Sequence, residues 1–192
     1  MNISGTHRMH DLNDLQGFLD GAWVQLARGV SDGQSAARFA TFATVSADGM
    51  PQARTVALRA ACRDSGTVEV HTDIATTKVS ELKQSPWAAL HIWVPQEELQ
   101  IRLSTRVEIL TGRGVAAQWT RVPPASRVSY GTEPAPGTPI AHATAYEKPA
   151  VQDRFAVLRC TIRDMDLVHL GQPHRRARYV ADEGWSGVWL AP

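Results

Sequence analysis

Residues 38–61 read RFATFATVSADGMPQARTVALRAA, two β-prone runs on either side of Asp48-Gly49. Asp and Gly tolerate the positive φ that a tight hairpin turn requires. The sequence therefore predicts a β-hairpin with strands over residues 38–46 and 52–61.

The second strand of this hairpin carries two arginines on opposite faces. With a period of two, Arg54 shares one face with two aliphatic residues, and Arg59 lies on the other. We therefore expect one arginine to point inward. Burial of a guanidinium is costly unless an anion pairs with it, and a ligand or a carboxylate would offset that cost equally well.

The next segments add more donors to the same region. A short strand is expected over residues 67–72, followed by a helical pattern from about 76 to 84. Thr76 and Thr77 are candidate N-cap residues, which would aim backbone N–H groups and the Lys78 ammonium at one place. This concentration of cations and hydroxyls favours a bound phosphate ester. The alternative is ordinary surface arginines and a helix cap followed by a solvated lysine.

Charge and length limit the class of protein. The 20 Lys+Arg residues nearly balance the 19 Asp+Glu residues, so the basic surplus of a nucleic-acid binder is missing. No stretch is apolar enough to predict a membrane span. The length of 192 residues suits a single domain over residues 1–192.

Cysteine usage and the first residues favour a cytoplasmic protein. Cys62 and Cys160 lack any short spacing, which is typical of reduced thiols in the core. Residues 1–11 contain no apolar signal segment. His7 and His10 are too loosely arranged to predict a metal site.

The rest of the chain alternates helical, extended and irregular patterns. An amphipathic helix is expected after Asp11, and residues 121–149 are expected to form a long loop that supplies the substrate-side wall. Clean alternation from Leu99 to Ile109 places Gln100 and Arg102 on one polar face, with an exposed sheet edge as the alternative. Further strands are expected over residues 157–162, 167–170, 178–181 and 187–190.

Several segments, taken in order, resemble the pyridoxamine 5′-phosphate oxidase-like flavoproteins, which are FMN-binding split β-barrels. They read RTVALR from Arg54, HTDIATTK from His71, SPWAALHIW from Ser85, ELQIRLSTRVE from Glu98, and HRRARYVADEGWSGVWLAP from His174. The chain is most similar to a short bacterial subgroup that also carries an AW…LAR helix from Ala22 and a PGTP segment from Pro136. The resemblance runs from about residue 22 to the last residue.

This resemblance implies a mainly β fold, a split antiparallel β-barrel with peripheral helices, which forms a homodimer with one FMN per subunit near the interface. It implies FMN contacts from Arg54, Thr55, Val56, Ala57, Leu58, Arg59, His71, Thr72, Thr77, Lys78, Gln100 and Arg178. Arg178 would reach the flavin from across the dimer boundary. The FMN phosphate is close to doubly charged, and Arg54, Arg59 and Lys78 could neutralise it.

The substrate side of the pattern departs from the family. Where pyridoxamine-phosphate oxidases carry R-L-H-D-R, this chain has HRRAR over residues 174–178, which retains only the final arginine. Val168 replaces a tryptophan near the flavin, and Trp119 and Pro123 replace a phosphate-gripping Tyr and Arg. The candidate substrate residues are therefore Trp119, Arg121, Arg127, His174 and Arg176.

The resemblance implies a flavin-dependent oxidoreductase that acts on a small molecule and does not specify which one. The departures on the substrate side predict that pyridoxamine 5′-phosphate and pyridoxine 5′-phosphate are poor substrates. No residue stands out as a general base. One alternative is an FMN carrier or sensor without catalysis. Another is a related barrel that holds a deazaflavin or haem, for which His71, His91 and His169 would be candidate axial ligands.

Overall fold

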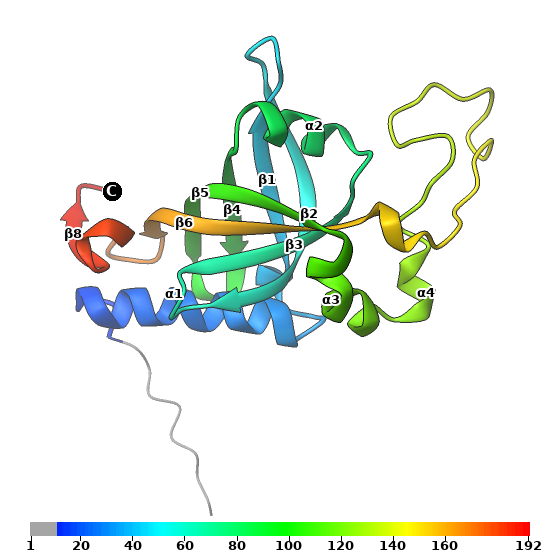
Figure 1. The fold of residues 1–192 in the computed structure, drawn as a ribbon. Coiled ribbons are helices and arrows are strands. Elements are labelled where there is room, and N and C mark those ends of the chain that lie inside the picture. The colour runs from blue at the N-terminus through cyan, green and yellow to red at the C-terminus, as the bar shows by residue number, and fades with distance from the viewer. Residues whose placement is uncertain (1–10) are drawn as a thin grey trace, which may run out of the picture.

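The computed structural model describes residues 11–192, which form a closed antiparallel β-barrel with helices at both ends (Figure 1). Within these residues the barrel strands follow the order β3-β2-β1-β4-β5-β6, and β6 pairs back with β3 to close it. Strands β7 and β8 extend the sheet beyond β6. The strands are β1 Phe39–Val45, β2 Pro51–Cys62, β3 Thr67–Asp73, β4 Trp87–Val94, β5 Leu99–Thr111, β6 Phe155–His169, β7 Arg175–Val180 and β8 Ser186–Leu190.

Helices α1 and α2 lie at opposite ends of the barrel (Figure 1). The amphipathic pattern after Asp11 does form α1, but the N-cap is Asp14, whose Oδ2 accepts from the Gly17 N–H at 2.8 Å. The α-helices are α1 Leu15–Ser31, α2 Thr77–Gln84, α3 Ala116–Arg121 and α4 Pro124–Arg127. Short 3₁₀ turns are η1 Ala36–Arg38, η2 Pro95–Glu97, η3 Gly112–Val115, η4 Gln152–Arg154 and η5 Ala181–Glu183.

The predicted hairpin is confirmed. Strands β1 and β2 pair antiparallel with Phe42 opposite Arg54, and Gly49 has a φ of 83° in the connecting turn. Burial on β2 alternates as expected, so that Arg54 shares the inward face with Leu58 while Arg59 is exposed. Arg54 is therefore the arginine that points inward.

The two strands predicted over residues 157–162 and 167–170 are wrong, because they are one strand, β6. The polar residues between them suggested a break. Instead, Ser104 pairs with Asp164 and Thr105 with Ile162, so Arg163 is an extra residue accommodated by a bulge. The next strand starts at Arg175 rather than at residue 178.

The prediction for residues 99–109 is confirmed in its alternation, and the alternative of a sheet edge is wrong. Strand β5 lies between β4 and β6, inside the sheet. Leu99, Ile101 and Leu103 are buried, while Gln100 and Arg102 lie on the opposite face. That face is polar although the strand is central.

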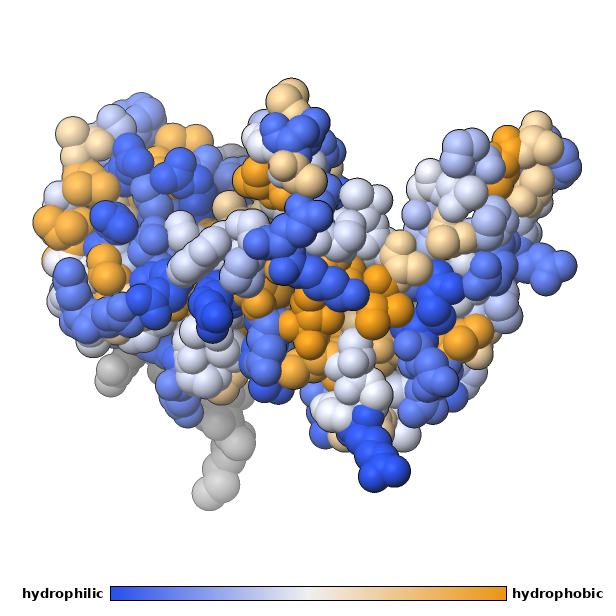
Figure 2. Space-filling model, turned by 45° about the horizontal axis from the view of Figure 1, so that its top comes forward, coloured by the Kyte–Doolittle hydropathy of each residue, from blue (hydrophilic) through white to orange (hydrophobic). Residues whose placement is uncertain are grey.

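A second, smaller core lies beside the barrel and positions the region around α3 and α4. Its buried members are Val115, Trp119, Val122, Tyr130, Phe155 and Val157. The segment that follows α4 is the long loop that the sequence predicts. Glu133 and Glu147 pair at its base, and it projects away from the barrel (Figures 1 and 2). Apolar side chains gather between this segment and the barrel (Figure 2).

The cysteines differ from expectation in one case. Both thiols are free; Cys160 is buried as predicted, but Cys62 is exposed at the end of β2. No helix among residues 11–192 has the length and apolar character needed to cross a membrane. His7 and His10 lie outside the described residues.

Candidate functional site

Lys78 and Arg54 lie together where α2 begins, in what we call the Lys78 cluster (Lys78, Arg54, Thr72, Thr44 and Glu81). Lys78 Nζ donates to Thr72 Oγ1 at 3.0 Å. Arg54 donates to Glu81 Oε2 at 3.1 Å and also to Thr44 Oγ1. The Thr44 hydroxyl donates to the same Glu81 oxygen at 2.5 Å. Glu81 therefore pairs with Arg54, whereas the one hydrogen-bond partner of Lys78 among residues 11–192 is the Thr72 hydroxyl.

The electrostatics of the Lys78 cluster favour a further anion. Burial, and next the Arg54 guanidinium, lower the pKa of Lys78, while Asp73 and Glu81 act in the opposite direction. Thr76 is the N-cap of α2, but its side chain makes no cap hydrogen bond. The Val79 N–H already donates to the Thr76 backbone oxygen at 2.9 Å, which leaves the Thr77 and Lys78 N–H groups at the start of the helix beside two cations.

Arg59 does not join this cluster. Leu58 pairs with Val70 and Ala60 with Glu69, so Arg59 is the extra residue of a β-bulge on β2. Its side chain lines a cavity of about 350 Å³, which we call the arginine pocket. The pocket is lined by Val30, Arg38, Leu58, Arg59, Ala60, Glu69, His71, Gln118, Arg121, Val122, Pro123, Ser126 and Tyr130.

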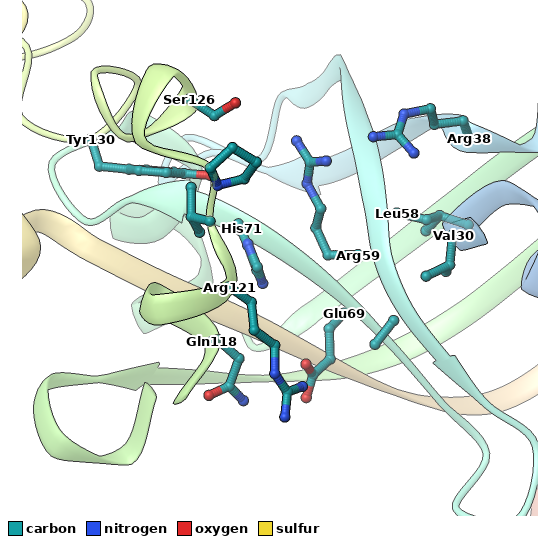
Figure 3. Close-up of a pocket in the computed structure, with 13 residues that line it drawn as sticks. Val30, Arg38, Leu58, Arg59, Glu69, His71, Gln118, Arg121, Ser126 and Tyr130 are labelled. Carbon is teal, nitrogen blue, oxygen red and sulfur yellow. The ribbon is translucent and has the colours of Figure 1, made fainter. Parts of the chain in front are cut away.

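The arginine pocket is cationic with an aromatic wall (Figure 3). Burial, and next the Arg59 guanidinium, lower the pKa of His71 to about 4, so its imidazole is neutral at pH 7. Burial raises the pKa of Tyr130. His71 and Tyr130 both pack edge-on against Phe155, with ring centroids 4.9 Å apart in each pair. The second core thus holds these two rings in place.

Asp73 connects the two regions. It follows Thr72 of the Lys78 cluster, and its side chain is almost fully buried. Its Oδ2 accepts from the Gly131 N–H at 2.7 Å, and its Oδ1 accepts from Arg154 Nε at 2.9 Å. Gly131 follows Tyr130, so the same carboxylate fixes the end of β3 and the aromatic wall of the arginine pocket.

Two other predicted cofactor residues, Gln100 and Arg178, lie on the outer surface of the sheet. His91 Nε2 and Gln100 Oε1 are 3.2 Å apart, on adjacent strands. Arg178 lies on β7, half exposed and 3.7 Å from Asp164. The described residues of one chain bring neither Gln100 nor Arg178 to the Lys78 cluster.

The remaining predicted cofactor residues lie on β2, where they alternate between the buried and the outer face, and at the start of α2. Val56 and Leu58 are buried core side chains, and Leu58 also lines the arginine pocket. Thr55 and Ala57 lie opposite β1 residues on the outer face. Thr77 is exposed at the first residue of α2.

The candidate substrate residues form two groups within one chain. Arg121 lines the arginine pocket, Trp119 belongs to the second core, and the Arg127 guanidinium stacks over the Trp119 ring at 5.1 Å. His174 is exposed just before β7, and Arg176 is on β7. Strand β6 separates the groups, and its 15 residues correspond to roughly 50 Å of extended chain.

Arg176 has a structural partner. It donates to both carboxylate oxygens of Asp166, at 3.2 and 2.9 Å, and Arg102 donates to one of them at 2.8 Å. Sequence reasoning missed this buried carboxylate. It also missed Arg38, Glu69 and Tyr130 in the arginine pocket, because no local pattern relates 3₁₀ turn η1 to β3 and the α4 region.

The barrel is a split barrel, as structural comparison shows. It matches a pyridoxamine 5′-phosphate oxidase-related, FMN-binding protein from Nostoc punctiforme with a TM-score of 0.75 and 24% identity, over 90% of this chain and 96% of that one. It also matches PhzG from Burkholderia lata, solved in complex with tetrahydrophenazine-1-carboxylic acid. That match has a TM-score of 0.66 and 20% identity, over 97% and 95% of the two chains.

The sequence comparisons point to the same family. Residues 20–111 match the model described as "Pyridoxamine 5′-phosphate oxidase, FMN-binding domain". This segment is therefore similar to that FMN-binding family.

Curated relatives match over similar segments. A pyridoxine/pyridoxamine 5′-phosphate oxidase 2 from Arabidopsis thaliana is 28% identical over 91 residues, 46% of each chain. A pyridoxine/pyridoxamine 5′-phosphate oxidase from Chromohalobacter salexigens is 44% identical over 68 residues, 35% of this chain and 31% of that protein. The chain thus spans less than half the length of these relatives.

The family match covers the two regions unequally. It contains the whole Lys78 cluster, together with Arg38, Arg59 and His71 of the arginine pocket. It ends at Thr111, before α3, and so excludes Arg121 and the β7 residues. The match therefore covers the Lys78 cluster and the strand side of the arginine pocket, but neither the α3 side of the pocket nor Arg178.

Proposed function

We propose that this chain is an FMN-dependent oxidoreductase whose FMN phosphate binds at the Lys78 cluster, and that residues 1–192 act as one split-barrel domain. The observation that carries the proposal is the half-buried Lys78 ammonium beside Arg54, inside the segment that matches an FMN-binding family. An anion there would relieve the repulsion between the two cations.

The residues present fit a phosphate monoester. Its charge at pH 7 is close to −2, and its oxygens accept hydrogen bonds. Lys78 has donors to spare, the Thr72 hydroxyl lies 3.0 Å from it, and the start of α2 lacks a side-chain cap. Glu81 already pairs with Arg54, so Lys78 is the cation with the greater capacity for a ligand.

We propose a homodimer as the form that completes the site. Three large apolar side chains on the outer faces of β1 and β4 are exposed: Phe39 by 58%, Trp87 by 52% and Trp93 by 39%. Tryptophan in such positions is typical of interfaces. A second copy against this face would bury these rings and would cover Gln100 and His91. It would also allow Arg178 of one copy to approach the cofactor of the other.

Bound FMN would supply two-electron transfer, and this chain would supply position and charge. Lys78 and Arg54 would hold the phosphate, and Arg178 would favour negative charge on the ring by its cationic field. The arginine pocket would receive a small-molecule substrate on the side of Arg59 and Arg121. We assign no general base.

Pyridoxamine 5′-phosphate should be a poor substrate. Arg176 is engaged by Asp166, and His174 and Pro123 stand where the family has substrate-binding residues. Loss of partners for a buried phosphate typically costs about 1–3 kcal/mol for each group. Steady-state formation of pyridoxal 5′-phosphate measures this directly, and efficient oxidation at micromolar substrate would restore the vitamin B6 assignment.

Titration with FMN and with riboflavin tests the proposed cofactor site. We expect an absorbance spectrum typical of a bound flavin and a strong preference for FMN, because riboflavin lacks the phosphate. The Lys78→Ala variant should lose that preference. Lys83→Ala, on the last turn of the same helix, is the matched control and should keep it. Equal affinity for FMN and riboflavin in the wild-type protein would refute the phosphate site, and a haem or deazaflavin spectrum would replace it.

A further inference from the structure

The arginine pocket has more positive charge than its own residues balance. Among residues 11–192, the guanidinium groups of Arg38, Arg59 and Arg121 make no hydrogen bond or ion pair. The one acidic lining residue, Glu69, is held by Arg159 at 3.0 Å. Three arginines against one glutamate leave two positive charges unbalanced in the lining.

The three arginines come from separate elements and occupy two sides of the cavity. Arg38 ends η1, Arg59 is the bulged residue of β2, and Arg121 ends α3. Figure 3 shows the guanidinium groups of Arg59 and Arg38 extending to one side, and that of Arg121 to the opposite side, between Gln118 and Glu69. One compact anion could therefore not be shared by all three.

The space between these arginines suits a small ring. The cavity volume of about 350 Å³ is at the lower end of the range for small-molecule pockets. Tyr130 and the neutral imidazole of His71 line the cavity as two rings that pack edge-on against Phe155. A planar conjugated ligand would stack or pack edge-on there.

Resting on the proposed function, we propose that the arginine pocket takes a planar ring compound with two separate acidic groups. Arg59 and Arg38 would bind one acidic group, and Arg121 would bind the second. Guanidinium groups pair with carboxylates through two parallel hydrogen bonds, which makes them selective for this arrangement. A ligand with a single phosphate would leave Arg121 without a partner.

Calorimetric titration of the FMN-loaded protein with three probes tests this assignment. The probes are benzene-1,3-dicarboxylate, benzoate and phenyl phosphate. We expect the dicarboxylate to bind at least about tenfold more tightly than either single-acid probe, since a second charge-assisted pair is gained. Comparable or tighter binding of benzoate or phenyl phosphate, or no binding of the dicarboxylate, would overturn the proposal.

Variants locate the two acidic groups. Arg121→Gln should reduce dicarboxylate affinity to the level of benzoate and leave benzoate affinity nearly unchanged, whereas Arg38→Gln should weaken both probes. Arg113→Gln, an exposed arginine in η3, is the matched control and should bind as the wild type does. Thermal melts identify any variant that fails to fold. Arg121→Lys keeps the positive charge but cannot form two parallel hydrogen bonds to a carboxylate, so it should bind the dicarboxylate with an intermediate affinity. Wild-type affinity in both Arg121 variants would contradict the assignment.

The same samples separate this inference from the proposed function. Normal FMN binding with no dicarboxylate binding would refute only the substrate class. Dicarboxylate binding to a protein that does not bind FMN would leave the pocket standing and refute the cofactor site. If saturating FMN blocked the dicarboxylate, the pocket would belong to the flavin, and the proposed substrate class would fall.

Discussion

The Lys78 cluster and the arginine pocket hold their cations in opposite ways. In the cluster, Arg54 is tied to Glu81 and Lys78 to the Thr72 hydroxyl. In the pocket, Arg59 is exposed at a bulge and unpaired within the described residues. In the Lys78 cluster, protein groups already pair with part of the positive charge. In the arginine pocket, nearly all of the positive charge needs a ligand to balance it. A fixed cofactor suits the former, and an exchangeable substrate suits the latter.

The largest effect is expected where the two regions meet. Asp73→Ala should lower the free energy of unfolding by about 3 kcal/mol, because it leaves Arg154 without its buried partner and the Gly131 N–H without an acceptor. Urea denaturation measures this loss. Asp153→Ala, an exposed acidic residue in η4, is the control and should change stability by less than about 0.5 kcal/mol. A small effect of Asp73→Ala would mean that the two regions are held independently.

Within the Lys78 cluster, the two cations should respond differently to removal. Lys78→Ala should weaken FMN binding by about 1.5–3 kcal/mol and leave the melting temperature of the cofactor-free protein nearly unchanged. Arg54→Ala should weaken FMN as well, but it should also destabilise the cofactor-free protein, because the Glu81 carboxylate is then buried without its cation. Melts with and without FMN distinguish the two cases. Identical behaviour of both variants would contradict the unequal pairing.

A pH effect is expected from the arginine pocket. The folded-state pKa of His71 is about 4 and its ordinary value is 6.5, so between these values the unfolded chain takes up a proton that the folded protein does not. Stability should therefore fall as the pH falls from 6.5 toward 4, by on the order of 1–2 kcal/mol after allowance for solvent screening. Thermal melts of wild type and His71→Gln across this window isolate the effect, since the variant should lose less. Parallel curves would show that His71 titrates normally.

The smallest effect on FMN affinity is expected at Arg59, and it tests whether this residue belongs to the arginine pocket alone. Arg59→Ala should change FMN affinity by less than about 1 kcal/mol, because among residues 11–192 its side chain makes no hydrogen bond to the Lys78 cluster and would act on the phosphate only at long range. The same variant should weaken benzoate binding in the arginine pocket. Loss of FMN affinity as large as that of Lys78→Ala would return Arg59 to the phosphate site that its sequence position first indicated.

Much of the cofactor side could be predicted from local pattern. The hairpin around Asp48-Gly49, the inward-facing Arg54, the start of α2 and the alternation of β5 all depend on residues that are close in sequence. Turn residues and the alternation of side chains along a strand act over a few neighbouring residues, so they can be recognised from the sequence without knowledge of the fold. The motif order was also enough to indicate the family.

The substrate side could not be predicted in this way. Closure of β3 on β6, the bulge that turns Arg59 aside, and the meeting of Arg38 with Arg121 depend on pairings between distant segments. The break expected inside β6 was wrong for the same reason, since a bulge opposite β5 absorbs the extra residue. Residue type and spacing determined which side chains could bind an anion. Long-range strand pairing decided which of them share a cavity, because contacts between distant segments are set by the packing of the whole barrel rather than by neighbours in the chain.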